Sequence, residues 1–188
     1  SPVTVADFAI QALVSHRLME AFPSDRLVAE EDSSTLKGSP LLEQVTAFVS
    51  DLEPAATPSE VCEWIDRGHA ADSSNPQSAI NNYQSSWSRY WLLDPIDGTK
   101  GFLRGGQYAV ALALMVDGQE RIGVLGCPSW GGPLTGSKGG NGGSLVFARR
   151  GQGTYITALE TVAELYANAW SLETNAAVGE LYGQVFTR

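Results

Sequence analysis

Apolar residues recur at helical spacing in three segments of the N-terminal third of the chain, and each segment is predicted to form a helix. The first runs from Thr4 to Phe22 and ends at Pro23. Its apolar stripe consists of Phe8, Ala9, Ala12, Leu13, Met19 and Phe22. The second covers residues 40–52, and the third has Ser59 as its expected N-cap. The expected inward-facing residues of this third helix are Val61, Trp64 and Ile65.

Short apolar runs and alternating patterns predict the strands. Residues 26–29 form a short strand that leads into Glu30, and residues 90–93 form a buried strand that leads into Asp94. Residues 108–116 alternate small alanines with larger apolar side chains, and Asp117-Gly118 is a strong signal for a hairpin turn. The remaining expected strands are 121–127, 144–149 and 153–156.

Helices that precede an antiparallel meander predict an α+β fold, with layered helices packed on an antiparallel sheet. The alanine face of residues 108–116 would let a helix approach closely, so we expect the helices at 4–22 and 41–52 to cover it. The polar segment 69–86 and the glycine-dense segment 131–143 are expected loops. A last apolar stripe predicts a helix over residues 157–170.

Charge narrows the possible partners of this protein. The 188 residues are 43% hydrophobic, enough for the core of one ordinary domain, and carry a net charge of -9. Such acidity argues against nucleic acids and anionic membranes as partners. It is compatible with a small phosphate-bearing substrate if divalent cations lie between the carboxylates and the substrate.

Cysteine usage and the chain start bear on the setting of the protein. Only Cys62 and Cys127 are present, without a Cys-x-x-Cys motif, which favours a reducing, cytoplasmic setting. Two histidines make a zinc site improbable. No apolar run is long enough to span a membrane, and no signal peptide opens the sequence. Because the sequence starts at Ser1 without a methionine, we expect it to be part of something longer.

The candidate chemistry centres on Asp94-Pro95-Ile96-Asp97-Gly98-Thr99. A strand that ends at Asp94, followed by a turn, can bring two carboxylates and the Ile96 carbonyl to one hard cation, which prefers oxygen ligands. The N–H groups of Gly98 and Thr99 could point at a bound phosphate from the start of a helix. Glu30, at the end of another strand, could supply a third carboxylate.

Alternative interpretations of these motifs can be weighed against the spacing. Asp-Pro and Asp-Gly pairs are common turn formers, but a buried strand leading into this six-residue motif is more specific than a turn. Phosphatases of the haloacid dehalogenase type use two aspartates two positions apart, whereas Asp94 and Asp97 are three apart. A P-loop is excluded because Ser137-Lys138 follows Gly136 in reversed order. Asp7 fits a capping box with Thr4, and a carboxylate there could also orient a metal-bound water.

At these motifs the chain resembles the inositol monophosphatase superfamily of metal-dependent, lithium-inhibited phosphatases. Within it, the chain looks most like the 3'(2'),5'-bisphosphate nucleotidases of fungi and plants. The matching segments are 1–8, 28–34, 91–105 (WLLDPIDGTKGFLRG) and 107–128. The segment Lys100-Gly-Phe-Leu-Arg104 is typical of the nucleotidase branch, and inositol phosphatases usually have Thr-Asn-Phe there. Ala29 stands where the family usually has glycine.

The resemblance implies a set of roles. Glu30, Asp94 and Asp97, with the Ile96 carbonyl, would hold Mg²⁺, while Asp7 and Thr99 would position and activate the attacking water. Gly98 and Thr99 would bind the substrate phosphate. The implied reaction is hydrolysis of a phosphomonoester, with 3'-phosphoadenosine 5'-phosphate and its sulfated relative from sulfate assimilation as the substrate class.

The resemblance also implies a division of the chain. Residues 1–156 would be the metal-binding N-terminal phosphatase domain, similar to that of inositol monophosphatase and fructose-1,6-bisphosphatase, and residues 157–188 a truncated or divergent tail. The family's C-terminal half, with a Trp-Asp-x-Ala type motif, is not found here. Two alternatives remain open: an inositol phosphate phosphatase of the same superfamily, and a non-catalytic truncated remnant. The oligomeric state is left open.

Overall fold

The computed structural model describes residues 4–68, 87–130 and 142–162. The expected loop at 69–86 and most of the expected loop at 131–143 lie outside the described residues, as does the helix expected over 157–170 beyond residue 162. The start of that predicted helix was wrong, because residues 157–158 are the end of a strand. The helical elements are α1 (Val5–Ala21), η1 (Ser33–Thr35), α2 (Pro40–Ser50), α3 (Pro58–Asp66) and α5 (Thr99–Phe102). The strands are β1 (Arg26–Ala29), β2 (Arg89–Asp97), β3 (Ala109–Val116), β4 (Gln119–Cys127), β5 (Ser144–Arg149) and β6 (Thr154–Ala158).

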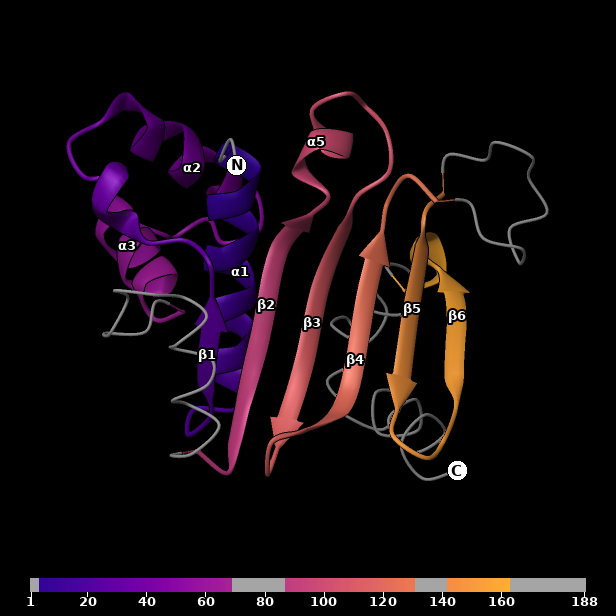
Figure 1. Cartoon of the computed structure of the whole chain (residues 1–188). Helices are drawn as coiled ribbons and strands as arrows, with labels where there is room; N and C mark the ends of the chain where they lie inside the picture. Colours follow the sequence, from indigo (N-terminus) through magenta and orange to yellow (C-terminus); the bar gives the residue numbers. More distant parts are fainter. Residues whose placement is uncertain (1–3, 69–86, 131–141, 163–188) are drawn as a thin grey trace, which may run out of the picture.

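The described strands form one six-stranded sheet in which they follow one another in sequence order, from β1 to β6. The predicted antiparallel meander is confirmed from β2 to β6. β1, by contrast, pairs in parallel with β2, with Ala29 opposite Leu93. The sheet is therefore mixed, and the chain between β1 and β2 includes α2 and α3. Figure 1 shows these helices grouped beside β1, at the opposite edge of the sheet from β6.

Capping residues define where the helices begin. α1 starts after Thr4, which forms a capping box with Asp7, and α2 starts after Ser39 with Pro40 in its first turn. The prediction of Ser59 as the cap of α3 was wrong. Thr57 is the N-cap, because Glu60 completes a capping box with it and Pro58 occupies the first turn.

α1 lies between the sheet and the other helices, and it buries a different face against each. The cluster toward α2 and α3 consists of Phe8, Ala9, Ala12, Leu36, Val45, Val49, Val61 and Ile65. The cluster toward the sheet consists of Leu18, Leu27, Trp91, Leu93 and Leu114, with Val110, Leu112 and Val116 packed against it. Because α1 buries one face against the helices and another against the sheet, it joins the two layers of this α+β fold.

Two expectations about this packing were wrong. α1 covers the face of β3 that carries Leu112 and Leu114, and not the alanine face, because large side chains from both elements fill the space between them. Met19, expected on the buried stripe of α1, is 36% exposed. Buried Leu18 is instead the residue of this turn that contacts the sheet.

The hairpin between β3 and β4 forms at the predicted turn. Val116 pairs with Gln119, and Asp117 and Gly118 between them have φ angles of 51° and 70°. Positive φ at both central residues is what a tight two-residue hairpin requires. Among the described helices, none is both long enough and apolar enough to span a lipid bilayer.

Candidate metal and phosphate site

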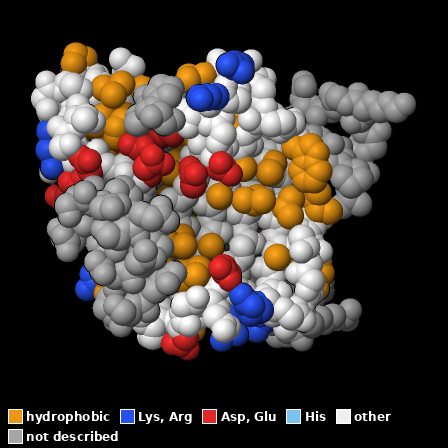
Figure 2. Space-filling model, viewed as in Figure 1, with side chains coloured by type: hydrophobic (Ala, Val, Ile, Leu, Met, Phe, Trp, Pro, Cys, Tyr) orange, Lys and Arg blue, Asp and Glu red, His pale blue; other side chains and the backbone are white. Residues whose placement is uncertain are grey.

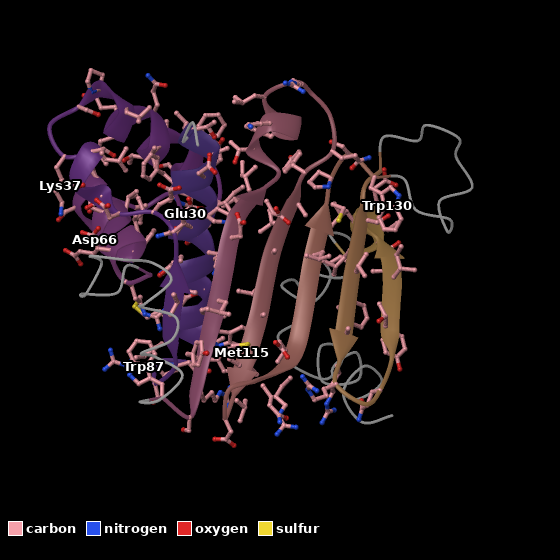
Figure 3. The ribbon with its side chains drawn as sticks, viewed as in Figure 1. Glu30, Lys37, Asp66, Trp87, Met115 and Trp130 are labelled. Atoms are coloured by element: carbon pink, nitrogen blue, oxygen red, sulfur yellow. The ribbon has the colours of Figure 1, made fainter. Side chains whose placement is uncertain are left out.

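The parallel pair β1–β2 brings the first two predicted ligands to the same end of the sheet. Since Ala29 is opposite Leu93, the next residues in register are Glu30 and Asp94. Glu30 is exposed just beyond β1, and Asp94 is half-buried within β2. Figure 3 shows Glu30 at the upper end of β1, on the side that faces β2.

A bulge in β2 separates Asp94 from Asp97. Asp94 pairs with Ala111 of β3 and Asp97 with Ala109, so three steps along β2 match two along β3. Bulges re-aim side chains near functional sites. Buried Pro95 lies in this bulge, where its missing N–H does not disturb a regular ladder. The two predicted carboxylates are thus presented by one irregular strand end.

The turn after Asp97 requires glycine. Gly98 has a φ angle of 91° and is the N-cap of the single-turn helix α5, which begins at Thr99 as predicted. The Thr99 hydroxyl donates to the carbonyl oxygen of Ile96 at 3.2 Å. This contact ties together the predicted carbonyl ligand and the predicted water-positioning hydroxyl, and a carbonyl oxygen has a second lone pair for another partner.

Asp7 caps α1, and it also lies close to the other carboxylates. Its Oδ2 accepts from the Thr4 backbone N–H at 2.8 Å and from the Thr4 hydroxyl at 2.5 Å. Its charge raises the pKa values of both Glu31 and Asp94. The cap is therefore confirmed, and the structure also places Asp7 within electrostatic reach of the predicted metal ligands.

The pKa values report how closely the acidic side chains approach one another. Burial raises the pKa of Asp94 above its ordinary value, and the charges of Asp97 and Glu30 raise it further. Burial, followed by the charges of Glu30 and Asp7, raises the pKa of Glu31 from 4.5 to about 7. These mutual effects show that the structure gathers the predicted carboxylates into one neighbourhood.

The acidic side chains of the described residues do not form a complete coordination sphere. Within residues 4–68, 87–130 and 142–162, no three Asp, Glu, His or Cys side chains surround a point where one metal ion could sit. The donors are nevertheless all oxygens, the ligand type that Mg²⁺ and Ca²⁺ prefer. Figure 2 shows Asp and Glu side chains along the upper part of one face, with Lys and Arg side chains above them over α5.

Sequence reasoning missed Gln11, which is 0% exposed in the middle of α1. Its side-chain amide accepts a hydrogen bond from the backbone N–H of Glu31 and donates one to the carbonyl oxygen of the same residue. It also donates to the carbonyl oxygen of Ile65 at the end of α3. A glutamine within an otherwise apolar helical face was the available signal. Its partners are backbone atoms 20 and 54 residues away, so no local pattern could identify them.

The fold and the site together define an α+β protein whose carboxylates gather where two parallel strands end, an arrangement that suits hard divalent cations. The chain belongs to the inositol monophosphatase family, which matches residues 1–180. This match extends past residue 156, the boundary expected for the phosphatase domain, and β6 itself runs to Ala158. The division of the chain at residue 156 stays a prediction.

The chain is also similar to curated proteins named 3'(2'),5'-bisphosphate nucleotidase 1. The Candida albicans protein is 40% identical over 166 residues, which are 85% of this chain and 44% of that protein. An Arabidopsis thaliana protein is 40% identical over 176 residues, 86% of this chain and 48% of that protein. The chain therefore spans less than half the length of these relatives.

Among solved structures, one similar chain is described as an IMPase/NADP phosphatase complexed with Mg²⁺ and phosphate. It is 20% identical, with a TM-score of 0.43, and the similarity covers 82% of this chain and 37% of that one.

Proposed function

We propose that the protein is a 3'(2'),5'-bisphosphate nucleotidase, which hydrolyses 3'-phosphoadenosine 5'-phosphate to AMP and phosphate with Mg²⁺. The observation that carries this proposal is the neighbourhood of Glu30, Asp94 and Asp97 at the ends of β1 and β2. Membership of the inositol monophosphatase family and about 40% identity to proteins named as bisphosphate nucleotidases support it.

Glu30, Asp94, Asp97 and the Ile96 carbonyl would hold the cation. Without a counter-ion their charges repel one another, and a divalent cation reverses that balance by drawing the oxygens inward. Bound there, Mg²⁺ would lower the pKa of a water molecule and neutralise phosphate oxygens.

Asp7 and Thr99 would orient the attacking water. Oδ1 of Asp7 lies outside the capping box with Thr4, and this oxygen could accept a proton from the water. The oxygen of the Thr99 hydroxyl can accept a second hydrogen bond while its proton is donated to Ile96. The turn at Gly98 and Thr99 would face the substrate phosphate.

The segment after this turn favours a nucleotide bisphosphate over an inositol phosphate. Lys100, in α5, and Arg104, two residues after the end of this helix, are both exposed in a chain whose net charge is -9. The positive charges of Lys100 and Arg104, close in sequence to the proposed phosphate site, would favour a substrate with a second phosphate group. The free thiols of Cys62 and Cys127 fit our further proposal that the protein works in the cytoplasm.

The test measures phosphate release by the complete gene product, with Mg²⁺, from 3'-phosphoadenosine 5'-phosphate and from inositol 1-phosphate. We expect a higher kcat/KM for the nucleotide and inhibition by Li⁺. Equal or faster turnover of inositol 1-phosphate would assign the protein to the inositol phosphatase branch. Absence of turnover with either substrate would leave a non-catalytic member of the family.

A further inference from the structure

The acidic segment Glu30–Asp32 is tied to the end of α3 on both of its sides. Before the segment, the Ala29 N–H donates to the Gly68 carbonyl oxygen at 2.8 Å. After it, the backbone N–H and the hydroxyl of Ser33 donate to the Asp66 carboxylate at 2.8 and 2.7 Å. Figure 3 shows Asp66 beside Lys37, whose ammonium group lies 3.1 Å from the same carboxylate.

Gln11 holds the middle of this segment. Its Oε1 accepts from the Glu31 N–H at 3.0 Å, and its Nε2 donates to the Glu31 carbonyl oxygen at 2.6 Å and to the Ile65 carbonyl oxygen at 2.9 Å. Both amide protons are therefore used by a side chain that is 0% exposed. Buried amides are costly to leave unpaired, so this geometry specifies the position of the Glu31 backbone strongly.

Gly68 lets the end of α3 come close enough for these bonds. A Cβ atom at this position would lie 2.8 Å from the Ala29 Cβ and 3.1 Å from the Gln11 Nε2. Real side chains do not approach this closely, so a larger residue at position 68 would displace either β1 or the amide. The close approach of Gly68 to β1 and the hydrogen bonds of Gln11 therefore depend on each other.

The carboxylates of the acidic segment repel one another, so the hydrogen bonds of Gln11 can do more than stabilise the packing of α1 and α3. Glu30, Glu31 and Asp32 are consecutive carboxylates, and the parallel register of β1 and β2 puts Glu30 beside Asp94. A flexible backbone would let such a segment swing away from Asp94. We propose that Gln11 is a positioning residue, which fixes the Glu31 backbone so that Glu30 stays beside Asp94 and the cation site is partly preorganised. This inference rests on the proposed function, since it takes Glu30 and Asp94 as cation ligands.

The test compares Gln11→Met, which keeps the length of the side chain without its hydrogen bonds, with the wild type. In the complete gene product we expect the Mg²⁺ concentration for half-maximal rate to rise about tenfold to a hundredfold, as for other residues that orient metal ligands. The kcat at saturating Mg²⁺ should fall much less. The affinity for Mn²⁺, measured by electron paramagnetic resonance, should fall in parallel.

Val49→Ala is the matched control. Val49 is 0% exposed in the cluster of α1, α2 and α3 and has no hydrogen-bonding side-chain group, so its truncation should lower stability by leaving a cavity. It should leave the Mg²⁺ requirement and the Mn²⁺ affinity unchanged. If both variants shift the Mg²⁺ requirement equally, the role of Gln11 is only structural and the inference is wrong.

A second pair of variants covers the case in which Gln11→Met fails to fold. Gly68→Ala should weaken Mn²⁺ binding by pushing on Ala29 and Gln11, and Gly68→Ala combined with Ala29→Gly should recover part of it by removing the closest contact. Native Mn²⁺ affinity in Gln11→Met or Gly68→Ala would overturn the inference. A wild-type protein that binds Mn²⁺ through Asp94 but releases no phosphate would instead overturn the proposed function.

Discussion

Glu31 carries the clearest electrostatic cost of gathering carboxylates at one end of the sheet. It is 9% exposed, and burial together with Glu30 and Asp7 raises its pKa from 4.5 to about 7. At a pH between these two pKa values, Glu31 is protonated more often in the folded protein than in the unfolded chain. Stability from this group is therefore complete below pH 4.5 and is lost as the pH rises through about 7.

Glu31→Gln should remove this pH dependence in protein treated with a chelator. We expect the variant to match the wild type near pH 4 and to be more stable than the wild type at pH 8, because it no longer buries a charge. Chemical denaturation at a series of pH values measures the difference. A variant with the same loss of stability between pH 4.5 and pH 8 as the wild type would show that another group is responsible.

Asp94→Asn and Asp97→Asn should each abolish most of the activity of the complete gene product. Each replaces a carboxylate of the proposed cation site by a neutral amide, and a loss of several kcal/mol in the transition state corresponds to a rate about a thousandfold lower. Circular dichroism should be unchanged. Asp51→Asn, which removes the same charge at the exposed C-cap of α2, is the control and should keep its rate. Near-normal turnover in either site variant would refute its assignment as a ligand.

Local sequence patterns predicted many of these residues, but not all of their contacts. The motif from Asp94 to Thr99 specified its own turn, because Pro95 and Gly98 restrict the backbone. The N-cap of α3 could have been identified from Thr57 and Glu60, which have capping-box spacing. The role of Gln11 could not, since it depends on tertiary contacts.

At the scale of elements, the site depends on one parallel strand pair and one tight turn. The parallel register of β1 and β2 brings Glu30 beside Asp94, and a local pattern does not reveal whether distant strands pair in parallel. The turn after β2 closes on Gly101, whose carbonyl oxygen accepts from the Gly106 N–H at 2.8 Å. The sequence therefore predicted the strands that carry Glu30 and Asp94, but not the parallel pairing that brings these two residues together.

Gly101→Ala should disrupt this turn. The added Cβ atom would lie 2.1 Å from the Gln107 carbonyl oxygen, which is backbone and cannot rotate away. We expect the free energy of unfolding to fall by about 1–3 kcal/mol, a typical cost of forced overpacking, and activity to fall with it. Denaturant titration measures the change.

Gly123→Ala in β4 is the matched substitution, since nothing lies within 4 Å of its Cβ position and its φ angle is not positive. It should change stability by less than about 0.5 kcal/mol. Equal effects of the two substitutions would mean that the close contact at Gly101 does not constrain the loop.

For the molecule as a whole, the order of helices and strands predicted the α+β class, and the motif from Asp94 to Thr99 predicted the position of the candidate site. The layering differed from expectation, because α1 uses two faces and covers the larger side chains of β3. Alternation along β3 identified both faces, but which of them a helix covers depends on the volumes on both sides. Part of the negative charge lies together, since Asp7, Glu30 and Asp97 are close enough to Asp94 for their charges to raise its pKa, after the larger effect of burial.

This convergence of negative charge predicts that divalent cations stabilise the folded chain. Binding to the folded state alone adds about 2.7 kcal/mol at a cation concentration one hundred times the Kd, and the unfolded chain has no assembled site. The melting temperature should therefore rise with MgCl₂ or CaCl₂ and rise much less with NaCl of equal ionic strength, which only screens the charges. Differential scanning calorimetry measures both, and Asp94→Asn should lose the specific part of the increase while Asp51→Asn keeps it. An equal rise with NaCl, or a full rise in Asp94→Asn, would mean that the cations act on the general charge of the surface, because a site built on Asp94 requires that carboxylate whereas screening does not.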